Sequence, residues 1–302
     1  MVTGSSNLYV VFVPLLAPGH MIPLVQLARL FAARGVRTTI ITTVHNALTI
    51  QPSIDRGYPL TVQTVNFPAS EVGLPTGIEN LSACTNAEMV SAVIRAMQLL
   101  RTPMEQLIRD VAPNCIFSDM FLTWTVDLAE ELKIPKLLFY PNSFLYHSVS
   151  HSLKIHAPYA DVKSESESFV VPKLPDNITM KRSQLSHHFW SKTRMGDSLE
   201  RVQQSEKRSY GLVHYTFYEI ETAYADHIKK IKGTKIWHTG PLFQLFNHQD
   251  RHCLTWLDDQ QPKSVIYVCF GSMVRFQEAQ ITEIALALEE LKQPFVWVVS
   301  DV

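Results

Sequence analysis

The sequence predicts an α/β protein built on a parallel sheet, and three observations favour this fold class. Short uncharged runs rich in Val, Ile, Leu and Phe recur along the chain, beginning with residues 8–16. These runs are apolar throughout rather than at every second position, which is typical of parallel strands covered on both faces. The segments between them repeat apolar residues at helical spacing. Strands that alternate with helices indicate βαβ units joined in one sheet.

Composition limits the class of protein. The chain has 302 residues, 46% hydrophobic and 18% charged, which suggests a globular protein of about two domains. The formal net charge is -1 and no basic block occurs, so nucleic acid and anionic membranes are not expected as partners. No run reaches transmembrane length, and the first strand lacks the basic region of a signal peptide. The four cysteines form no C-x-x-C pair, so we expect reduced thiols and a cytoplasmic protein.

The first strand, turn and helix span residues 8–35. The strand ends before Pro18 and Gly19, which interrupt the apolar run. The helix that follows carries apolar residues at i, i+3, i+4 and i+7, namely Leu24, Leu27, Ala28 and Phe31. We expect Pro23 in the first turn of this helix and Gly35 just beyond its end.

His20 lies where this buried strand passes into the helix, and Asp119 follows the buried strand at residues 115–118. A single histidine in such a turn could simply cap the helix or lie exposed. However, right-handed crossovers bring the carboxyl ends of parallel strands to one edge of the sheet. We therefore expect His20 and Asp119 on the same rim, where doubly wound folds bind their ligands. A titratable imidazole there is suited to acid–base chemistry near neutral pH.

Further elements are expected along the first domain, residues 1–245. Thr85 and Glu88 have capping-box spacing and predict a long helix that continues past Pro103. Residues 68–80 form a Pro- and Gly-rich loop long enough to wall a binding site. Residues 236–242 are predicted to be an extended segment that leaves the domain. The other strands are expected at 36–43, 60–67, 136–140 and 210–217, and the other helices at 123–132, 197–209 and 220–231.

A second domain is predicted to begin at residue 263, after a linker at residues 246–262. A strand at 264–272, a helix at 278–291 and a strand at 295–299 make one βαβ unit. One such unit cannot cover both faces of its own sheet. The sequence therefore predicts only the start of a second domain within residues 263–302.

Several stretches resemble the plant family 1 UDP-glycosyltransferases, which act on flavonoid, phenolic or terpenoid acceptors. They include PGHMIPLVQLARLF around His20, SDMFLTWTVDLAEEL around Asp119, EKRSYG, WHTGP and CLTWLDDQQPKSVIYVCFGS. The resemblance covers residues 8–299. It implies two Rossmann-like domains that face a cleft, the GT-B arrangement, with the second domain only partly present. The amino-terminal domain would hold the acceptor and the carboxyl-terminal domain the nucleotide sugar.

The resemblance also implies an activity and roles for single residues. His20 would be the general base and Asp119 its orienting partner in an inverting transfer of a sugar, glucose being expected, from a UDP-sugar to an acceptor hydroxyl. Ser272 matches a phosphate-contacting serine beside Gly271, and Ser143 is a candidate donor contact. A UDP-sugar co-substrate is implied, without metal or other cofactor, in a monomeric enzyme.

Two departures from the family pattern bear on function. His214-Tyr215-Thr216 stands where Val-Asn-Ser is more usual, which we interpret as conservative for the fold. The family's long donor-binding signature, with its Trp-Ala-Pro-Gln opening, is missing, so a chain truncated before that motif is expected. The alternative function is therefore an inactive glycosyltransferase-like protein that binds small molecules or a full-length partner.

Other functional classes lack their motifs in this sequence. Pro18-Gly19-His20 is not the G-x-G-x-x-G turn of a dinucleotide oxidoreductase, and no G-x-S-x-G hydrolase elbow or Walker motif occurs. The pairs His147/His151 and His248/His252 have spacing that a metal could use, but neither belongs to an H-E-x-x-H motif. We predict that these are incidental surface histidines and that no metal site is present.

Overall fold

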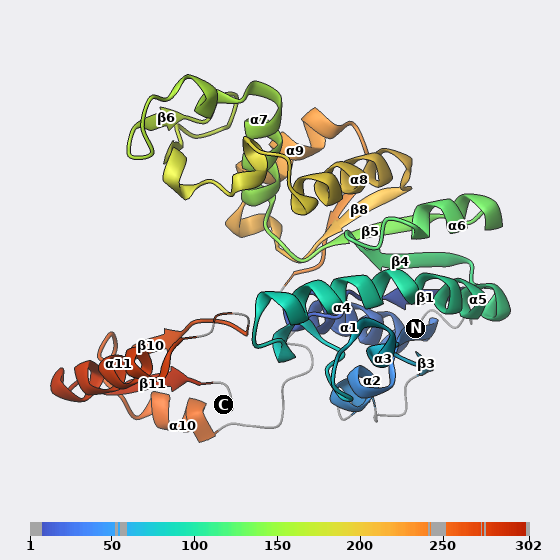
Figure 1. Ribbon diagram of the computed structural model, residues 1–302, viewed down its shortest axis with the longest axis horizontal. Helices are drawn as coiled ribbons and strands as arrows, with labels where there is room; N and C mark the ends of the chain where they lie inside the picture. The colour runs from blue at the N-terminus through green and yellow to red at the C-terminus, as the bar shows by residue number, and fades with distance from the viewer. Residues whose placement is uncertain are drawn as a thin grey trace.

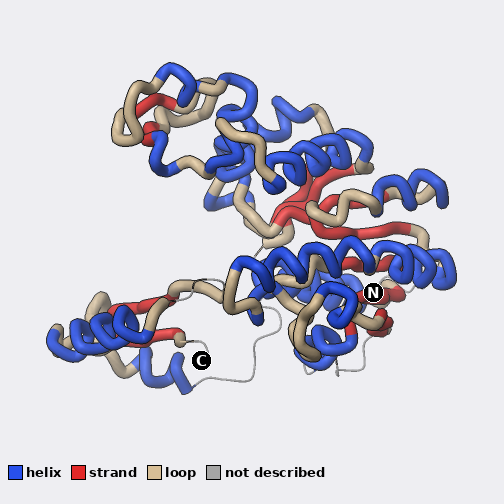
Figure 2. Tube along the Cα trace, viewed as in Figure 1, coloured by secondary structure: helices blue, strands red, loops and turns tan. Residues whose placement is uncertain are grey.

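The computed structural model describes residues 8–51, 54, 59–240, 242, 252–272, 274 and 276–299. Most of these residues form one large α/β part, and residues 252–299 form a small unit drawn in orange and red (Figure 1). The large part is centred on one sheet with helices on both sides of it (Figure 2). No described helix is both long and apolar enough to cross a membrane.

The large sheet contains seven strands, and every neighbouring pair runs parallel. Their order across the sheet is β3-β2-β1-β4-β5-β8-β9, so the order reverses between β1 and β4. Val13 of β1 lies beside Ser118 of β4 in the register of the ladder. The bounds are β1 Tyr9–Val13, β2 Arg37–Thr43, β3 Leu60–Val65, β4 Cys115–Asp119, β5 Lys136–Tyr140, β8 Gly211–His214 and β9 Ile236–His238.

Helices connect these strands and cover the sheet. The α-helices of the large part are α1 Pro18–Ala33, α2 Val44–Ile50, α3 Ala69–Val72, α4 Ala87–Leu99, α5 Arg101–Val111, α6 Thr125–Leu132, α7 Phe144–His156, α8 Arg194–Arg208 and α9 Thr222–Lys232. Short 3-10 turns are η2 Leu81–Ala83, η3 Pro158–Asp161, η4 Arg182–Gln184, η5 His187–Phe189 and η6 Tyr218–Ile220. A small antiparallel hairpin joins β6 Ser168–Val170 and β7 Thr179–Lys181.

The core follows from the alternation of side chains along fully buried strands. Val10 and Phe12 pack with α1 on one face of the sheet, whereas Val11 and Val13 pack with α5 and α6 on the other. All five residues of β1 are buried, because both of its faces are covered. The seven-stranded parallel sheet agrees with the α/β fold class expected from the apolar runs.

The first helix begins earlier than its sequence predicts. It starts at Pro18, in the first turn, where a missing N–H leaves no hydrogen bond unmade. Pro23 therefore lies inside the helix rather than in its first turn, and this part of the prediction is wrong. Gly35 follows the helix with φ of 80°, a left-handed conformation that glycine adopts without strain, as expected.

The long helix predicted to open at Thr85 and to continue past Pro103 is two helices. It ends at Leu99 and α5 starts at Arg101, because Pro103 has no N–H to continue the hydrogen-bond ladder across the join. The predicted capping box is also wrong. Asn86 is the N-cap, and its Oδ1 accepts a hydrogen bond of 2.9 Å from the N–H of Met89.

Two further expectations are corrected at the end of the large part. Residues 236–238 do not leave the domain but form the edge strand β9, paired with β8. Leu242 is 1% exposed in the core beyond it. No helix was predicted for residues 144–156, where α7 packs against α9. Polar residues such as His147, Ser148 and Ser152 are buried on α7, so its buried face has little apolar periodicity.

The small carboxyl-terminal unit contains α10 His252–Asp258, β10 Ile266–Cys269, α11 Glu278–Glu290 and β11 Phe295–Val298. Its two strands pair in parallel, as expected of one βαβ unit. Part of the predicted linker, residues 246–251, lies outside the described residues, and α10 occupies residues 252–258 of the remainder. The division at residues 245 and 263 stays a prediction.

Candidate functional site

The fold places His20 at the edge of the sheet where ligands bind in doubly wound proteins. Strand β1 ends at Val13 and α1 begins at Pro18, so His20 is in the first turn of that helix. The strand order reverses between β1 and β4, and the crevice at such a reversal lies outside the carboxyl ends of the strands. The structure therefore puts His20 at this switch point.

Asp119, the last residue of β4, faces His20 across the same crevice. Its Oδ2 lies 2.7 Å from Nδ1 of His20, and the Asp119 side chain is fully buried whereas that of His20 is 24% exposed. The Oδ1 of Asp119 accepts a hydrogen bond of 3.0 Å from the N–H of Phe121. Both carboxylate oxygens are thus engaged, which fixes the orientation of the imidazole.

This arrangement defines which nitrogen of His20 can react. The carboxylate can only accept, so Nδ1 carries the hydrogen that the Asp119 contact requires. In a neutral imidazole Nε2 is then unprotonated and available as a base. The ring of Phe121 lies beside that of His20, with 5.8 Å between the ring centroids. The pair has the geometry of the histidine and carboxylate of a catalytic triad.

The other predicted site residues are not joined to this pair. Ser143 is the N-cap of α7, and its Oγ accepts a hydrogen bond of 3.0 Å from the N–H of Tyr146. Gly271 and Ser272 are exposed just after β10, where Gly271 has φ of 77°. Among the described residues no hydrogen bond or ion pair links these three to His20 or Asp119.

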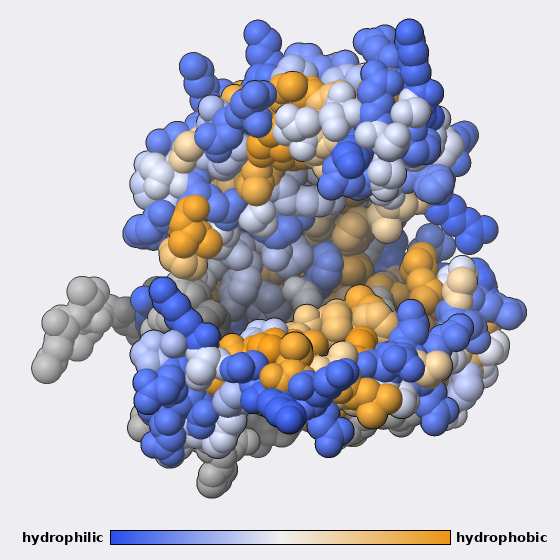
Figure 3. Space-filling model, turned by 90° about the vertical axis from the view of Figure 1, so that its left-hand side faces the viewer, coloured by the Kyte–Doolittle hydropathy of each residue, from blue (hydrophilic) through white to orange (hydrophobic). Residues whose placement is uncertain are grey.

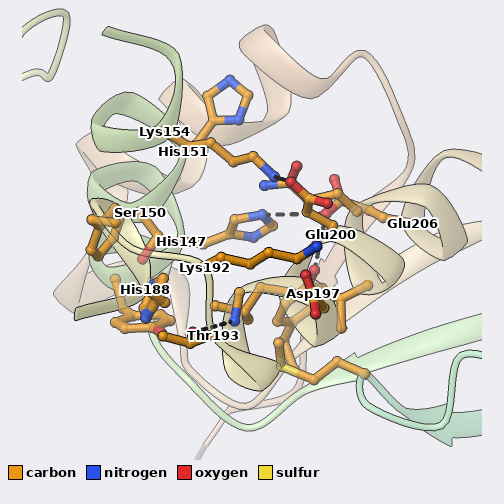
Figure 4. Close-up of a pocket in the computed structure, with 18 of the residues that line it drawn as sticks. His147, Ser150, His151, Lys154, His188, Lys192, Thr193, Asp197, Glu200 and Glu206 are labelled. Atoms are coloured by element: carbon orange, nitrogen blue, oxygen red, sulfur yellow. Dashed lines mark hydrogen bonds and ion pairs between the residues drawn. The ribbon is translucent and has the colours of Figure 1, made fainter. Parts of the chain in front are cut away.

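A cavity of about 510 Å³ lies between α7 and α8 (Figure 4). Met120, which follows Asp119 directly in the chain, lines one side of it, and η5 and α9 contribute Phe189 and Lys232. The surface is also hollowed below the part that carries α7 and α8, and apolar residues gather under this hollow (Figure 3).

A buried polar network reaches the inner end of this cavity, and it was missed in the sequence. His147 of α7 and Glu206 of α8 point toward one another (Figure 4), with 3.5 Å between Nε2 and Oε2. Glu206 accepts a hydrogen bond of 2.9 Å from the hydroxyl of Tyr140 and pairs with Lys232 Nζ at 2.7 Å. Nδ1 of His147 lies 3.2 Å from Nε2 of His214, the last residue of β8.

Burial and charge set the protonation of this network. Burial lowers the pKa of His147, and burial lowers that of His214 to about 3. Burial favours the protonated acid of Glu206, but its contacts with His147 and Lys232 outweigh that effect and hold its pKa at about 2. Near pH 7 both imidazoles are therefore neutral and Glu206 is ionised.

The prediction that His147 is an incidental surface residue is wrong, since only 7% of it is exposed. His151 is half-buried and lines the cavity. The sequence shows its i,i+4 spacing with His147, but no helix was predicted at residues 144–156. That the two histidines lie on one face of a helix could therefore not be inferred. His248 lies outside the described residues, as does the side chain of His252. The described residues contain no cluster of His, Cys, Asp and Glu that could hold a metal.

Comparison with known proteins gives a consistent set of relatives. The chain is 46% identical to solanidine UDP-glucose glucosyltransferase 1 of Solanum tuberosum and 45% identical to nuatigenin 3-beta-glucosyltransferase of Solanum aculeatissimum. Each alignment covers 99% of this chain but only 66% of the relative, so the chain spans just under two thirds of their length. No family model matches.

A solved structure agrees with these relatives in sequence and in fold. The crystal structure of Glycyrrhiza uralensis UGT73P12 complexed with glycyrrhetinic acid 3-O-monoglucuronide superimposes with a TM-score of 0.89 at 37% identity. The match covers 98% of this chain and 63% of that protein.

Proposed function

Because this chain belongs to the plant UDP-glycosyltransferases, we propose that it moves glucose from a UDP-sugar to a hydroxyl of a small plant metabolite. Flavonoids, phenylpropanoids and terpenoids are the proposed acceptor classes, and the relatives named for flavonoid, scopoletin and solanidine substrates support them. The observation that carries the proposal is the 2.7 Å contact between His20 and Asp119 at the switch point of the sheet.

The proposed chemistry assigns one role to each member of the pair. As the acceptor oxygen forms its bond to the anomeric carbon, Nε2 of His20 takes the hydroxyl proton. The bond from the anomeric carbon to the UDP oxygen breaks, and UDP leaves with the electron pair. Attack from the face opposite UDP inverts the anomeric centre. Asp119 keeps Nδ1 protonated and stabilises the imidazolium as it forms.

The donor is proposed to contact the start of the second domain. Gly271 and Ser272 stand at the carboxyl end of β10, and an exposed hydroxyl with neighbouring backbone N–H groups suits a diphosphate. Ser143 stays a candidate donor contact, since its Oγ accepts from the backbone while its own hydrogen remains available to a ligand. This transfer is proposed to require no metal or other cofactor.

The proposal also covers the cellular compartment and the oligomeric state, in general terms. The described cysteines are free thiols, which supports a reducing compartment such as the cytoplasm. We propose a monomer whose partners are the acceptor and the UDP-sugar.

The test uses a chimera, since the chain spans 66% of its potato relative. Residues 1–302 are continued by the remaining third of that enzyme, and glucose transfer from UDP-glucose is measured on a panel of sterol, flavonoid and coumarin acceptors. We expect turnover that disappears in His20→Ala. A folded chimera that binds acceptors yet transfers nothing would favour the alternative, a protein that binds small molecules without catalysis.

A further inference from the structure

Residues 79–81, here called the wall segment, end the long loop after β3 and lie across the carboxyl ends of two strands. The N–H of Leu81 donates a hydrogen bond of 2.9 Å to the carbonyl oxygen of Leu16, in the turn between β1 and α1. The carboxylate of Glu79 accepts a hydrogen bond of 3.1 Å from the N–H of His45, in the first turn of α2. The wall segment is therefore fastened to the turn after β1 and to the helix after β2.

Two buried asparagines strengthen this attachment. Asn46 of α2 is 2% exposed and Asn80 of the wall segment is 8% exposed. Nδ2 of Asn46 donates to Oγ1 of Thr43 at 2.8 Å and to the carbonyl oxygen of Glu79 at 3.0 Å. Nδ2 of Asn80 donates to Oδ1 of Asn46 at 2.8 Å. The backbone and one side chain of the wall segment are thus bound to the same buried amide.

The partners fix the orientation of both amides. The carbonyl oxygen of Glu79 only accepts, so the nitrogen of Asn46 faces it and the oxygen of Asn46 faces Asn80. The backbone N–H of Ser82 only donates, so the atom of Asn80 that lies 3.1 Å from it is Oδ1. Rotating either amide by 180° would place two donors or two acceptors against each other. The pair therefore holds a single arrangement.

The wall segment adjoins the crevice that contains His20. Leu81 packs against the buried cluster that includes Leu16 and Ala17. Phe121 packs against the same cluster, and its ring lies beside the imidazole of His20. The carbonyl oxygen of Ala17 accepts a hydrogen bond of 3.0 Å from the N–H of His20. Displacing the wall segment would therefore change the surface next to the proposed base.

We propose that Asn46 and Asn80 are positioning residues, which hold the wall segment in place as one side of the acceptor site beside His20. The inference rests on the proposed function, because it concerns how the acceptor of that reaction is bound. Among the described residues, no hydrogen bond or ion pair joins either asparagine to His20 or Asp119. The asparagine pair would therefore affect acceptor affinity rather than proton transfer.

Removing the asparagine pair should weaken acceptor binding and leave the chemical step unchanged. A site that is correctly formed for only a fraction of the time has an apparent Kd equal to its intrinsic Kd divided by that fraction. Losing one or two buried hydrogen bonds lowers such a fraction roughly tenfold. In the chimera, Asn80→Ala should therefore raise the acceptor KM roughly tenfold, with kcat and the KM for UDP-glucose within about twofold of wild type.

Two further variants separate positioning from general stability. Asn46→Ala removes the same hydrogen bond from its other side, and the double variant should bind acceptor about as weakly as Asn46→Ala alone. Asn114→Ala is the matched control, because Oδ1 of Asn114 accepts a hydrogen bond of 2.7 Å from the N–H of Tyr9, at the opposite end of β1. This control should keep the acceptor KM. Circular dichroism checks the fold of each variant.

An unchanged acceptor KM in Asn80→Ala, or an equal rise in Asn114→Ala, would overturn the inference. Titration calorimetry on residues 1–302 gives a second readout that needs no transfer. Quercetin and solanidine are the ligands, and Asn80→Ala should bind them roughly tenfold more weakly than the wild-type chain does. Failure of the wild-type chain to bind either ligand would also overturn the inference.

The two proposals can fail separately. A chimera without transfer, in a chain whose acceptor affinity falls in Asn80→Ala, would keep the positioning role and remove the transferase. A chimera that transfers glucose with the same acceptor KM in wild type and Asn80→Ala would keep the transferase and remove the positioning role.

Discussion

At the scale of single residues, the proposed base depends on one contact. Asp119 is fully buried and holds Nδ1 of His20 at 2.7 Å, which leaves Nε2 for the acceptor. In the chimera, His20→Ala should lower turnover by about 10²–10⁴-fold, the usual contribution of a general base. Glucose transfer gives the measurement and circular dichroism checks the fold. Wild-type turnover in this variant would exclude His20 as the base.

Asp119 should act mainly through His20. Asp119→Asn keeps the shape but removes the charge that stabilises the imidazolium, so kcat should fall with little change in acceptor KM. The double variant with His20→Ala should be hardly slower than His20→Ala alone, because the two residues work as one unit. Multiplicative losses in the double variant would instead indicate an independent role for Asp119.

Lys136 is a buried amine outside the proposed site, and it gives a pH prediction. It is 2% exposed, its Nζ contacts Ser205 Oγ at 3.0 Å, and burial lowers its pKa from 10.5 to about 7. Between pH 7 and pH 10.5 the unfolded chain therefore binds more protons at this residue, so its contribution to stability rises with pH. The destabilisation caused by burying the Lys136 charge has its full size below about pH 7 and is absent above about pH 10.5.

Lys136→Met should accordingly raise the free energy of unfolding by roughly 2–5 kcal/mol at pH 6–7, and the gain should shrink toward pH 10. Urea unfolding of both proteins at several pH values measures the difference between their free energies of unfolding. The titration of other groups is common to both proteins and cancels in this difference. A gain that does not change with pH would show that the charge of Lys136 is not the cause.

At the scale of elements, the pairing of β8 with β9 requires a glycine. A Cβ on Gly211 would lie 2.7 Å from the carbonyl oxygen of Lys235 and 2.4 Å from the Trp237 ring. Gly211→Ala should therefore lower the free energy of unfolding by about 1–3 kcal/mol, as overpacking does. Gly19→Ala is the control, because a Cβ there has no neighbour within 4 Å. Equal stabilities of the two variants would contradict the close approach.

At the scale of the whole molecule, the hydrophobic clusters divide the chain near residue 245. None of the clusters among the described residues extends beyond Leu242, and Ile236 and Leu242 are both buried within them. A chain ending at residue 245 should therefore unfold cooperatively with a Tm close to that of the 302-residue chain. Thermal unfolding followed by circular dichroism measures it, and a loss of cooperativity would argue against the domain boundary.

A chain ending at residue 235 is the matched comparison. It lacks β9 and two buried aliphatic side chains, each worth about 2–5 kcal/mol by large-to-small substitution, and should be much less stable. Similar melting of the two truncated chains would mean that β9 is not part of the cooperative sheet.

Much of the fold could be predicted from local pattern. Apolar runs such as residues 9–13 and 137–140, with helices between them, indicated a parallel sheet, and strand ends placed His20 and Asp119 on one rim. Segments whose buried face is polar could not be predicted this way. The helix α7 buries His147, Ser148 and Ser152, so hydrophobic periodicity gave no signal there.

The sequence by itself determined the sheet and the strand-end position of His20. Apolar runs and their order along the chain are local properties, and parallel strands joined by right-handed crossovers all end at the same edge of the sheet. Only the tertiary structure decided the contacts among Glu206, His147 and His214 and their protonation states. These residues come from α8, α7 and β8, and nothing in their sequence spacing relates them. Burial between packed elements lowers the pKa values of both histidines, and contacts with His147 and Lys232 lower that of Glu206; these contacts and this burial are properties of the whole fold.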